Sequence, residues 1–170
     1  MELWGQIIGI VGMVVCCLSY QCFDKKKLLI VQTVGAGLLG VQYLLLGSIA
    51  GFTMNMVGLL RNFFYYHRDK KLFSGIWLPI TMTVLMTVVG FLSWGGPRSL
   101  LIIVGLVVNT FCMGVCDSQQ LRKSLLVTCP LVLVYSILEG ALGGILNESI
   151  SIISAVVGIV RYARSQRSAR

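Results

Sequence analysis

The side chains that could do chemistry in this chain are isolated polar groups within long apolar stretches. Asn147 and Glu148 lie in the apolar stretch 142–162, and Asn55 lies in the stretch 49–66. A carboxylate accepts hydrogen bonds and can take up a proton, and a carboxamide both donates and accepts. We therefore predict that these three residues bind a polar solute, with cations and hydrogen-bond donors favoured over anions and proton coupling conceivable. The alternative is interhelical hydrogen bonding that only fixes packing.

A second polar pair follows Asn55 within the same stretch. Arg61 is six residues further on, which is roughly 9 Å along a helix, and Asn62 is beside it. The long Arg61 side chain could reach Glu148 as a charge partner or gate, with Asn62 assisting. Equally, it could extend to the lipid headgroups while its stem stays in the apolar region.

The remaining reactive side chains predict neither catalysis nor a metal site. The chain has one histidine, His67, and six cysteines, of which Cys112 and Cys116 are one helical turn apart. A zinc site would need further ligands, and no nucleophile has a general base near it in the sequence. We expect no enzymatic activity, no catalytic residues, no metal and no cofactor.

Composition indicates that the bilayer is the solvent for most of this chain. Hydrophobic residues make up 56% of the 170 residues, charged residues make up 12%, and mean hydropathy is +0.87. A soluble domain of this size could not bury so much apolar surface. The first stretch has no preceding basic segment and no convincing cleavage site, so we expect a retained span rather than a leader. The predicted spans are Leu3–Cys22, Leu28–Leu46, Ile49–Tyr66, Phe73–Trp94, Ser99–Val115, Leu121–Leu138 and Leu142–Tyr162.

Basic residues predict the orientation of these spans. Twelve of them follow the first, third, fifth and seventh spans, and Arg98 alone lies in a loop on the other side. Cytoplasmic loops carry such an excess of Lys and Arg, so we predict an outside N-terminus and a cytoplasmic C-terminus. The net charge of +8 comes from small clusters beside the membrane. Attraction to anionic lipid explains these clusters, and we expect no binding to nucleic acid.

The chain also contains an internal repeat. Residues 10–68 match residues 103–161 at a constant offset of 93, with 14 identities in 59 positions. The repeat pairs the first three spans with the last three, which leaves the fourth span as a linker. We therefore predict one transmembrane domain, 1–170, made of repeat 3–68, linker helix 73–94, repeat 99–162 and basic tail 163–170. Two three-helix units of the same orientation form a parallel repeat, with a solute site between them near the midplane.

Two more candidate residues follow from this alignment. Glu148 stands opposite Asn55, and Asn109 stands opposite Cys16, so Asn109 is a further candidate for solute binding. Pro130 stands opposite Gly37 in the middle of a span. Both residues weaken a helix, so they could serve as hinges or could simply accommodate packing.

Several motifs resemble the bacterial inner-membrane YgjV family. They are Gly47-Ser48-Ile49-Ala50-Gly51 with Arg61-Asn62, Gly140-Ala141-Leu142-Gly143-Gly144 with Asn147-Glu148, and Gly158-Ile159-Val160-Arg161. The three-one-three layout is similar to that of the SWEET sugar transporters, their PQ-loop relatives and the Pnu-type vitamin transporters. That resemblance implies two three-helix bundles around a central site. The Pro-Gln pair of PQ-loop proteins is absent, because Ser19-Tyr20-Gln21 stands there, so a sugar substrate is not implied.

The expected function is therefore movement of a solute across the bacterial inner membrane. We predict an all-α membrane protein that acts as a small secondary carrier or facilitator by alternating access. Its solute would be a polar metabolite such as a sugar, vitamin, nucleoside or amine. The expected partners are the lipid bilayer and this solute, and a homodimer is possible. The alternative is a membrane interaction, assembly or sensor protein that does not transport.

Overall fold

The computed structural model describes residues 2–19, 25–67, 75–116 and 118–168. These residues form seven α-helices and no strand, which confirms the all-α prediction. The helices are α1 (Glu2–Ser19), α2 (Lys25–Leu45), α3 (Ile49–Tyr66), α4 (Trp77–Leu92), α5 (Ser99–Val115), α6 (Ser118–Leu138) and α7 (Leu142–Ser168). The bounds of α3 and α5 are those predicted from the apolar pattern. The largest difference is in α7, which continues as helix through Ser168 where a separate tail was predicted from residue 163.

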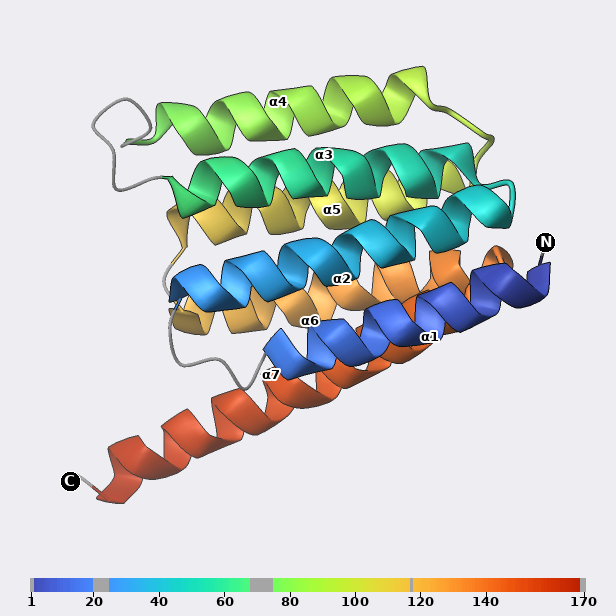
Figure 1. Cartoon of the computed structure of the whole chain (residues 1–170). Coiled ribbons are helices and arrows are strands. Elements are labelled where there is room, and N and C mark those ends of the chain that lie inside the picture. The colour runs from blue at the N-terminus through green and yellow to red at the C-terminus, as the bar shows by residue number, and fades with distance from the viewer. Residues whose placement is uncertain (1, 20–24, 68–74, 117, 169–170) are drawn as a thin grey trace.

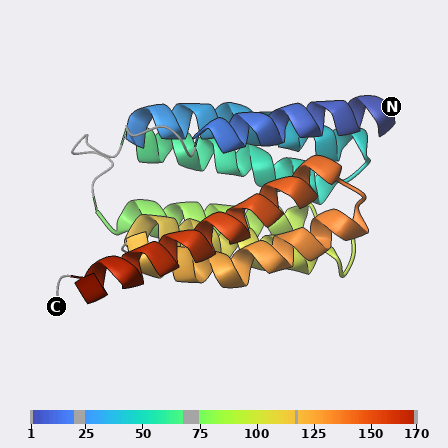
Figure 2. The same cartoon turned by 90° about the horizontal axis from the view of Figure 1, so that it is seen from below.

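Six of these helices pack into a closed ring. Helix α2 contacts both α1 and α3, and α6 contacts both α5 and α7. The contacts of α3 with α5 and of α7 with α1 close the ring. Helix α4 packs outside this ring against α3 and α5, at the edge of the bundle (Figure 1). Viewed along a perpendicular direction, α1, α2 and α3 form one layer and α5 and α6 a second, with α7 crossing obliquely (Figure 2).

Two glycine turns make α2–α3 and α6–α7 tight antiparallel hairpins. Gly47 and Gly140 have φ of 79° and 67°, a left-handed conformation that side chains disfavour. The N–H of Ser48 donates to the Tyr43 carbonyl at 2.8 Å, and the N–H of Ala141 donates to the Ser136 carbonyl at 2.9 Å. The same helix-ending motif therefore closes both hairpins, at positions 93 residues apart.

The distribution of polarity is the reverse of that in a water-soluble protein. Leu92 and Trp77 are 82% and 77% exposed, whereas Gln42, Thr110 and Ser136 are fully buried. Large apolar side chains cover the outside of the bundle and polar groups lie within it. This arrangement suits a hydrocarbon solvent, in which buried polar groups must find partners inside the protein.

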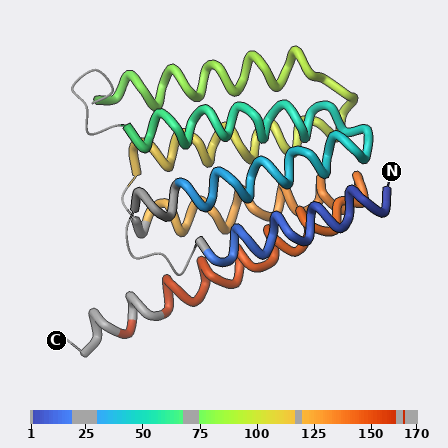
Figure 3. The backbone as a smooth tube through the Cα atoms, in the orientation of Figure 1, coloured from blue at the N-terminus to red at the C-terminus, as the bar shows by residue number. Residues whose placement is uncertain are grey.

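Helix length identifies two clear membrane-spanning candidates among the described residues. The segments Gln120–Leu138 of α6 and Leu142–Val160 of α7 are long and apolar enough to cross a bilayer. The apolar segments of α1, α2, α4 and α5 are shorter, and α4 with 16 residues extends about 24 Å against a hydrocarbon core of roughly 30 Å. Helix α7 begins at the same end of the bundle as α1 and runs toward the opposite end (Figure 3).

Candidate functional site

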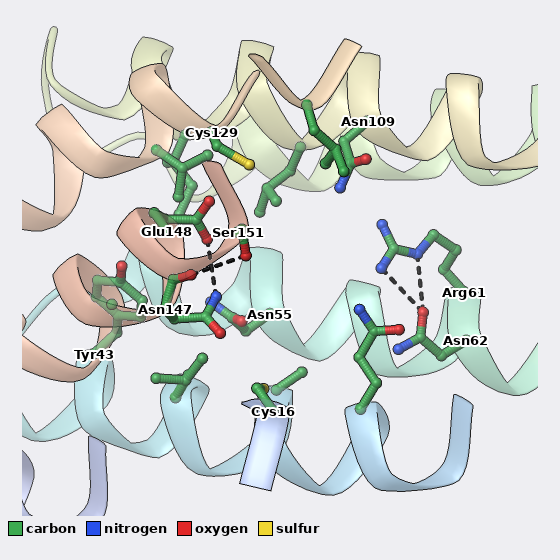
Figure 4. A pocket seen from close by; sticks show the side chains of 18 residues that line it. Cys16, Tyr43, Asn55, Arg61, Asn62, Asn109, Cys129, Asn147, Glu148 and Ser151 are labelled. Carbon is green, nitrogen blue, oxygen red and sulfur yellow. Dashed lines mark hydrogen bonds between the residues drawn. The ribbon is translucent and has the colours of Figure 1, made fainter. Parts of the chain in front are cut away.

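A cavity of about 140 Å³ lies inside the ring of helices (Figure 4). All six ring helices line it, and α4 does not. Its lining consists of Cys16, Gln32, Ala36, Leu39, Tyr43, Asn55, Arg61, Asn62, Ile102, Leu106, Asn109, Leu125, Cys129, Val132, Gly144, Asn147, Glu148 and Ser151.

The structure brings almost all of the predicted site residues to this one cavity. Asn55, Arg61, Asn62, Asn109, Asn147 and Glu148 all line it. Pro130 does not, although it follows the lining residue Cys129 within α6. The hinge role predicted for Pro130 therefore concerns the helix and not direct contact with a solute.

Glu148 and its neighbours form one end of the cavity. The Asn147 amide donates to Oε1 of Glu148 at 3.1 Å, and the Cys129 thiol lies near the same carboxyl group. Asn55 donates its amide to the Gly51 carbonyl at 2.8 Å, one turn earlier in α3. Asn55 and Glu148 thus line the cavity together without being hydrogen-bonded to each other.

Arg61 and its partners form the other end of the cavity, as Figure 4 shows. Arg61 is 7% exposed, and its Nε and Nη2 donate to Oδ1 of Asn62 at 3.2 and 3.0 Å. Nη1 donates to the Thr110 hydroxyl at 3.1 Å, which ties α3 to α5. Neither interaction anticipated for Arg61 occurs, because Thr110 and Asn62 hold its head inside the protein and away from both the headgroups and Glu148.

Sequence reasoning missed several of the lining side chains. Gln32 has a buried Oε1 without a hydrogen-bond partner in the part of the chain that the structure describes. Tyr43, Cys16, Cys129 and Ser151 also reach the cavity. Gln32 carries the same carboxamide group as Asn55 and could have been found by the same argument, whereas tyrosine, cysteine and serine are less costly in an apolar stretch. The internal repeat could have found some of them, since it placed Cys16 opposite Asn109.

Positions that are equivalent in the two halves of the chain face the same cavity. Five pairs of lining residues are separated by the offset of 93 found in the sequence. They are Cys16 with Asn109, Gln32 with Leu125, Ala36 with Cys129, Leu39 with Val132, and Asn55 with Glu148. The cavity therefore lies where matching faces of the two halves meet.

Polar contacts join the two halves near the glycine turns. The hydroxyls of Tyr43 and Ser136, again 93 residues apart, are 2.7 Å from each other. The hydroxyls of Ser48 and Tyr135 also form a hydrogen bond, and the rings of Tyr43 and Tyr135 pack with centroids 5.8 Å apart. These contacts close the ring between the cavity and the end of the bundle at which the turns lie.

Glutamines add to this closure at the start of α7. The Gln6 amide donates to the Gly140 carbonyl at 2.7 Å, and its Oε1 accepts from the Leu142 N–H at 3.1 Å. The amide group of Gln42, which is fully buried, lies 2.9 Å from the same Gln6 oxygen and faces the backbone N–H groups of Leu142 and Gly143. The first half of the chain thereby satisfies backbone groups at the beginning of α7, which have no partners within that helix.

Comparison with known proteins places the chain in a family. Residues 3–166 match the family Imp-YgjV, described as "Bacterial inner membrane protein". The chain is similar to "Inner membrane protein YgjV" of Escherichia coli (strain K12), with 20% identity over 163 residues that cover 96% of this chain and 86% of that protein. No solved structure matches it significantly. Because the family match covers nearly the whole sequence, this chain belongs to the YgjV family of bacterial inner membrane proteins.

Proposed function

We propose that this protein is a secondary carrier or facilitator for a small polar metabolite, with its binding site in the central cavity. The observation that carries the proposal is the lining of this cavity. All six ring helices contribute to it, at matching positions of the two halves, and its polar groups include a carboxylate, a guanidinium and several carboxamides. Polar groups are costly inside a membrane protein, and they commonly mark solute paths.

The proposal includes an arrangement in the membrane. All seven helices span the bilayer as two parallel three-helix units, with α4 as the linker, the N-terminus outside and the C-terminus in the cytoplasm. The contact of α7 with α1 is the counterpart of the contact of α3 with α5, which supports such a repeat. The excess of basic residues on the predicted cytoplasmic side supports this orientation. The direction of α7 also supports it, because α7 runs away from the end of the bundle at which α1 begins. In this layout the protein is similar to SWEET-type transporters. The shorter helices are accommodated by local thinning of the bilayer.

Transport then proceeds by movement of one three-helix unit against the other. The hydrogen bonds between Tyr43 and Ser136 and between Ser48 and Tyr135 close the outer end in this state. Opening toward the outside breaks them and closes the inner end, where Arg61 and Asn62 line the cavity. No step needs ATP, since the free energy comes from the solute gradient or from a coupled proton.

A binding screen on the detergent-purified protein tests this proposal. A ligand that binds only the folded state at one hundred times its Kd adds about 2.7 kcal/mol of stability. We expect a sugar, vitamin, nucleoside, amine or amino acid to raise the thermal midpoint, and we expect Asn55→Ala and Glu148→Gln to abolish that shift. Glu139→Gln is the matched control, because Glu139 does not line the cavity.

The same screen distinguishes the alternative function. If the protein is well folded and no compound changes its thermal midpoint, an interaction, assembly or sensor role is favoured over transport. A positive result leads to uptake measurements in proteoliposomes, in which the Glu148→Gln variant is expected to be inactive and the Glu139→Gln variant active.

A further inference from the structure

Two opposite formal charges line the same cavity without forming an ion pair. Arg61 and Glu148 are both lining residues, and they lie at opposite ends of the cavity in Figure 4. Among the residues that the structure describes, no carboxylate pairs with Arg61 and no cationic group pairs with Glu148. A buried charge is costly unless a partner compensates it. The protein therefore offers two separate sites for charged groups in one small space.

The Arg61 end is equipped to bind an anion. A guanidinium has five N–H donors in a planar fork, and the described contacts use one on Nε, one on Nη1 and one on Nη2. One N–H on each terminal nitrogen remains without a contact among the described residues. Donors of a guanidinium can bind the oxygens of a carboxylate. Asn62 and Thr110 hold the guanidinium in place, so little side-chain entropy is lost on binding.

The Glu148 end is equipped to bind a cationic donor. Asn147 occupies only part of the acceptor capacity of the carboxylate. The amide nitrogen of Asn55 donates to the Gly51 carbonyl. The amide oxygen of Asn55 is therefore left as a further acceptor at the cavity. An ammonium group has three donors and no acceptor, and this cluster of oxygens suits it.

The cavity has room for a small ligand. Its volume of about 140 Å³ can hold several water molecules. A molecule of a few heavy atoms therefore fits it. A ligand with a short skeleton can place one group at each charged end.

We propose that the cavity binds a small zwitterion, an amino acid whose ammonium group meets Glu148 and whose carboxylate meets Arg61. This inference rests on the proposed carrier function and names its substrate class. An amine alone leaves Arg61 without a counter-charge, and a carboxylate alone leaves Glu148 without one. A neutral solute leaves both uncompensated. A zwitterion compensates both charges and adds no net charge to the interior of the membrane protein.

A series of small ligands related to alanine tests the inference on the purified protein. Calorimetric titration compares alanine with three analogues. Ethylamine lacks the carboxylate, propionate lacks the ammonium group, and propionamide lacks both charges. Losing one partner of a buried charge pair costs several kcal/mol, so alanine is expected to bind roughly 100-fold more tightly than each analogue. Equal affinity for alanine and any one analogue would overturn the inference.

Charge-neutralising variants provide the second part of the test. Glu148→Gln is expected to weaken alanine binding and to make propionate the better ligand, whereas Arg61→Gln is expected to make ethylamine the better one. If Arg61→Gln does not fold, Arg61→Lys replaces it, because lysine keeps the charge but lacks the planar set of donors. This variant is expected to lose affinity selectively for alanine and propionate. Equal weakening of all ligands by Glu148→Gln would contradict the assigned roles.

The outcomes also separate this inference from the proposed function. If a sugar or another uncharged solute binds and Glu148→Gln abolishes that binding, the cavity is a solute site but the ligand is not a zwitterion. If no compound of any class binds to the folded protein, the carrier proposal fails and the zwitterion inference fails with it.

Discussion

At the scale of single residues, Tyr43 and Arg61 connect the two halves of the chain. Tyr43 packs against Gly51 and Gly144, which are 93 residues apart, and its hydroxyl reaches Ser136. Arg61 reaches Thr110 across the contact between α3 and α5. Both interactions are possible only because the surrounding helices approach closely, and small residues at helix contacts permit such approach. Changes to these close contacts should therefore be costly.

Replacing Gly144 with alanine tests the packing around Tyr43. The added Cβ would lie 2.6 Å from the Tyr43 hydroxyl oxygen and 2.8 Å from Oγ of Ser136. Overpacking of this kind typically costs about 1–3 kcal/mol, so we expect a lower thermal midpoint in detergent. Gly58→Ala is the control, because a Cβ there would meet no heavy atom within 4 Å. A Gly144→Ala protein as stable as the Gly58→Ala protein would contradict this packing.

Replacing Thr110 with valine tests the anchoring of Arg61. The change keeps the shape but removes the hydroxyl that accepts from Nη1 of Arg61 and donates to Sδ of Met86. Loss of a buried partner of a charged group costs about 1–3 kcal/mol, and we expect destabilisation of this size in chemical unfolding. Thr81→Val is the matched control, since among the described residues the exposed Thr81 hydroxyl bonds only to the Trp77 carbonyl in its own helix. Similar effects of the two changes would show that Thr110 does not anchor Arg61.

At the scale of elements, two hairpins of the same construction determine how α2–α3 and α6–α7 sit beside each other. Gly47 and Gly140 end α2 and α6 in the same left-handed conformation. A Cβ at either position would meet no neighbouring atom within 4 Å. Substitution there thus changes backbone strain alone, with no steric clash.

Gly47→Ala and Gly140→Ala are expected to destabilise the protein to a similar extent. A residue with a Cβ pays about 1–2 kcal/mol in the left-handed region, and the thermal midpoint of each variant should fall accordingly. Gly95→Ala serves as the control, because Gly95 is not among the glycines with positive φ and its Cβ would meet only ordinary contact with Ser99. A neutral result at either turn would be inconsistent with the left-handed turn geometry.

At the scale of the whole molecule, most of the described side-chain hydrogen bonds between the halves lie at the end of the ring with the glycine turns. Tyr43–Ser136, Ser48–Tyr135 and the Gln6 contacts all lie there. At the other end, Arg61 and Tyr65 of α3 bond to Thr110 of α5. The cavity with Cys129 lies beyond the contacts at the glycine turns, and Cys129 is 4% exposed. In the carrier proposal, the rate at which a water-soluble reagent reaches Cys129 from the outside reports how often the end with the glycine turns opens.

Tyr43→Phe is expected to speed that labelling. The change removes one hydrogen bond between the halves, while the Ser136 hydroxyl keeps its bond to the Val132 carbonyl. A loss of about 1 kcal/mol from the closed state should raise the labelling rate roughly fivefold. The measurement uses a variant whose only cysteine is Cys129 and a small, membrane-impermeant thiosulfonate. Thr53→Val is the control, because Thr53 bonds to Ser93 outside the contact between the halves. An unchanged rate in Tyr43→Phe would mean that this bond does not hold the outer end closed.

The presence of the helices, the bounds of α3 and α5 and six of the lining residues of the cavity could be predicted from the sequence itself. Apolar runs as long as α3 and α5 have few alternatives to helix in a hydrocarbon solvent, since every backbone group must bond internally. In such runs a polar residue is conspicuous, which is why Asn55 and Glu148 could be singled out without a structure. The inner-membrane location and the family were recognisable for the same reason, because apolar composition and turn motifs are properties of the sequence.

Only the tertiary structure decided how those polar groups combine. Arg61 could have reached Glu148 or the headgroups, and the position of Thr110 on α5 directs it to neither. The roles of Gln32 and Gln42 depend on which helix face turns inward, and that is set by the packing of six helices at once. Whether two buried charges pair or stand apart depends on side-chain directions across helix contacts, and spacing along one helix does not contain that information.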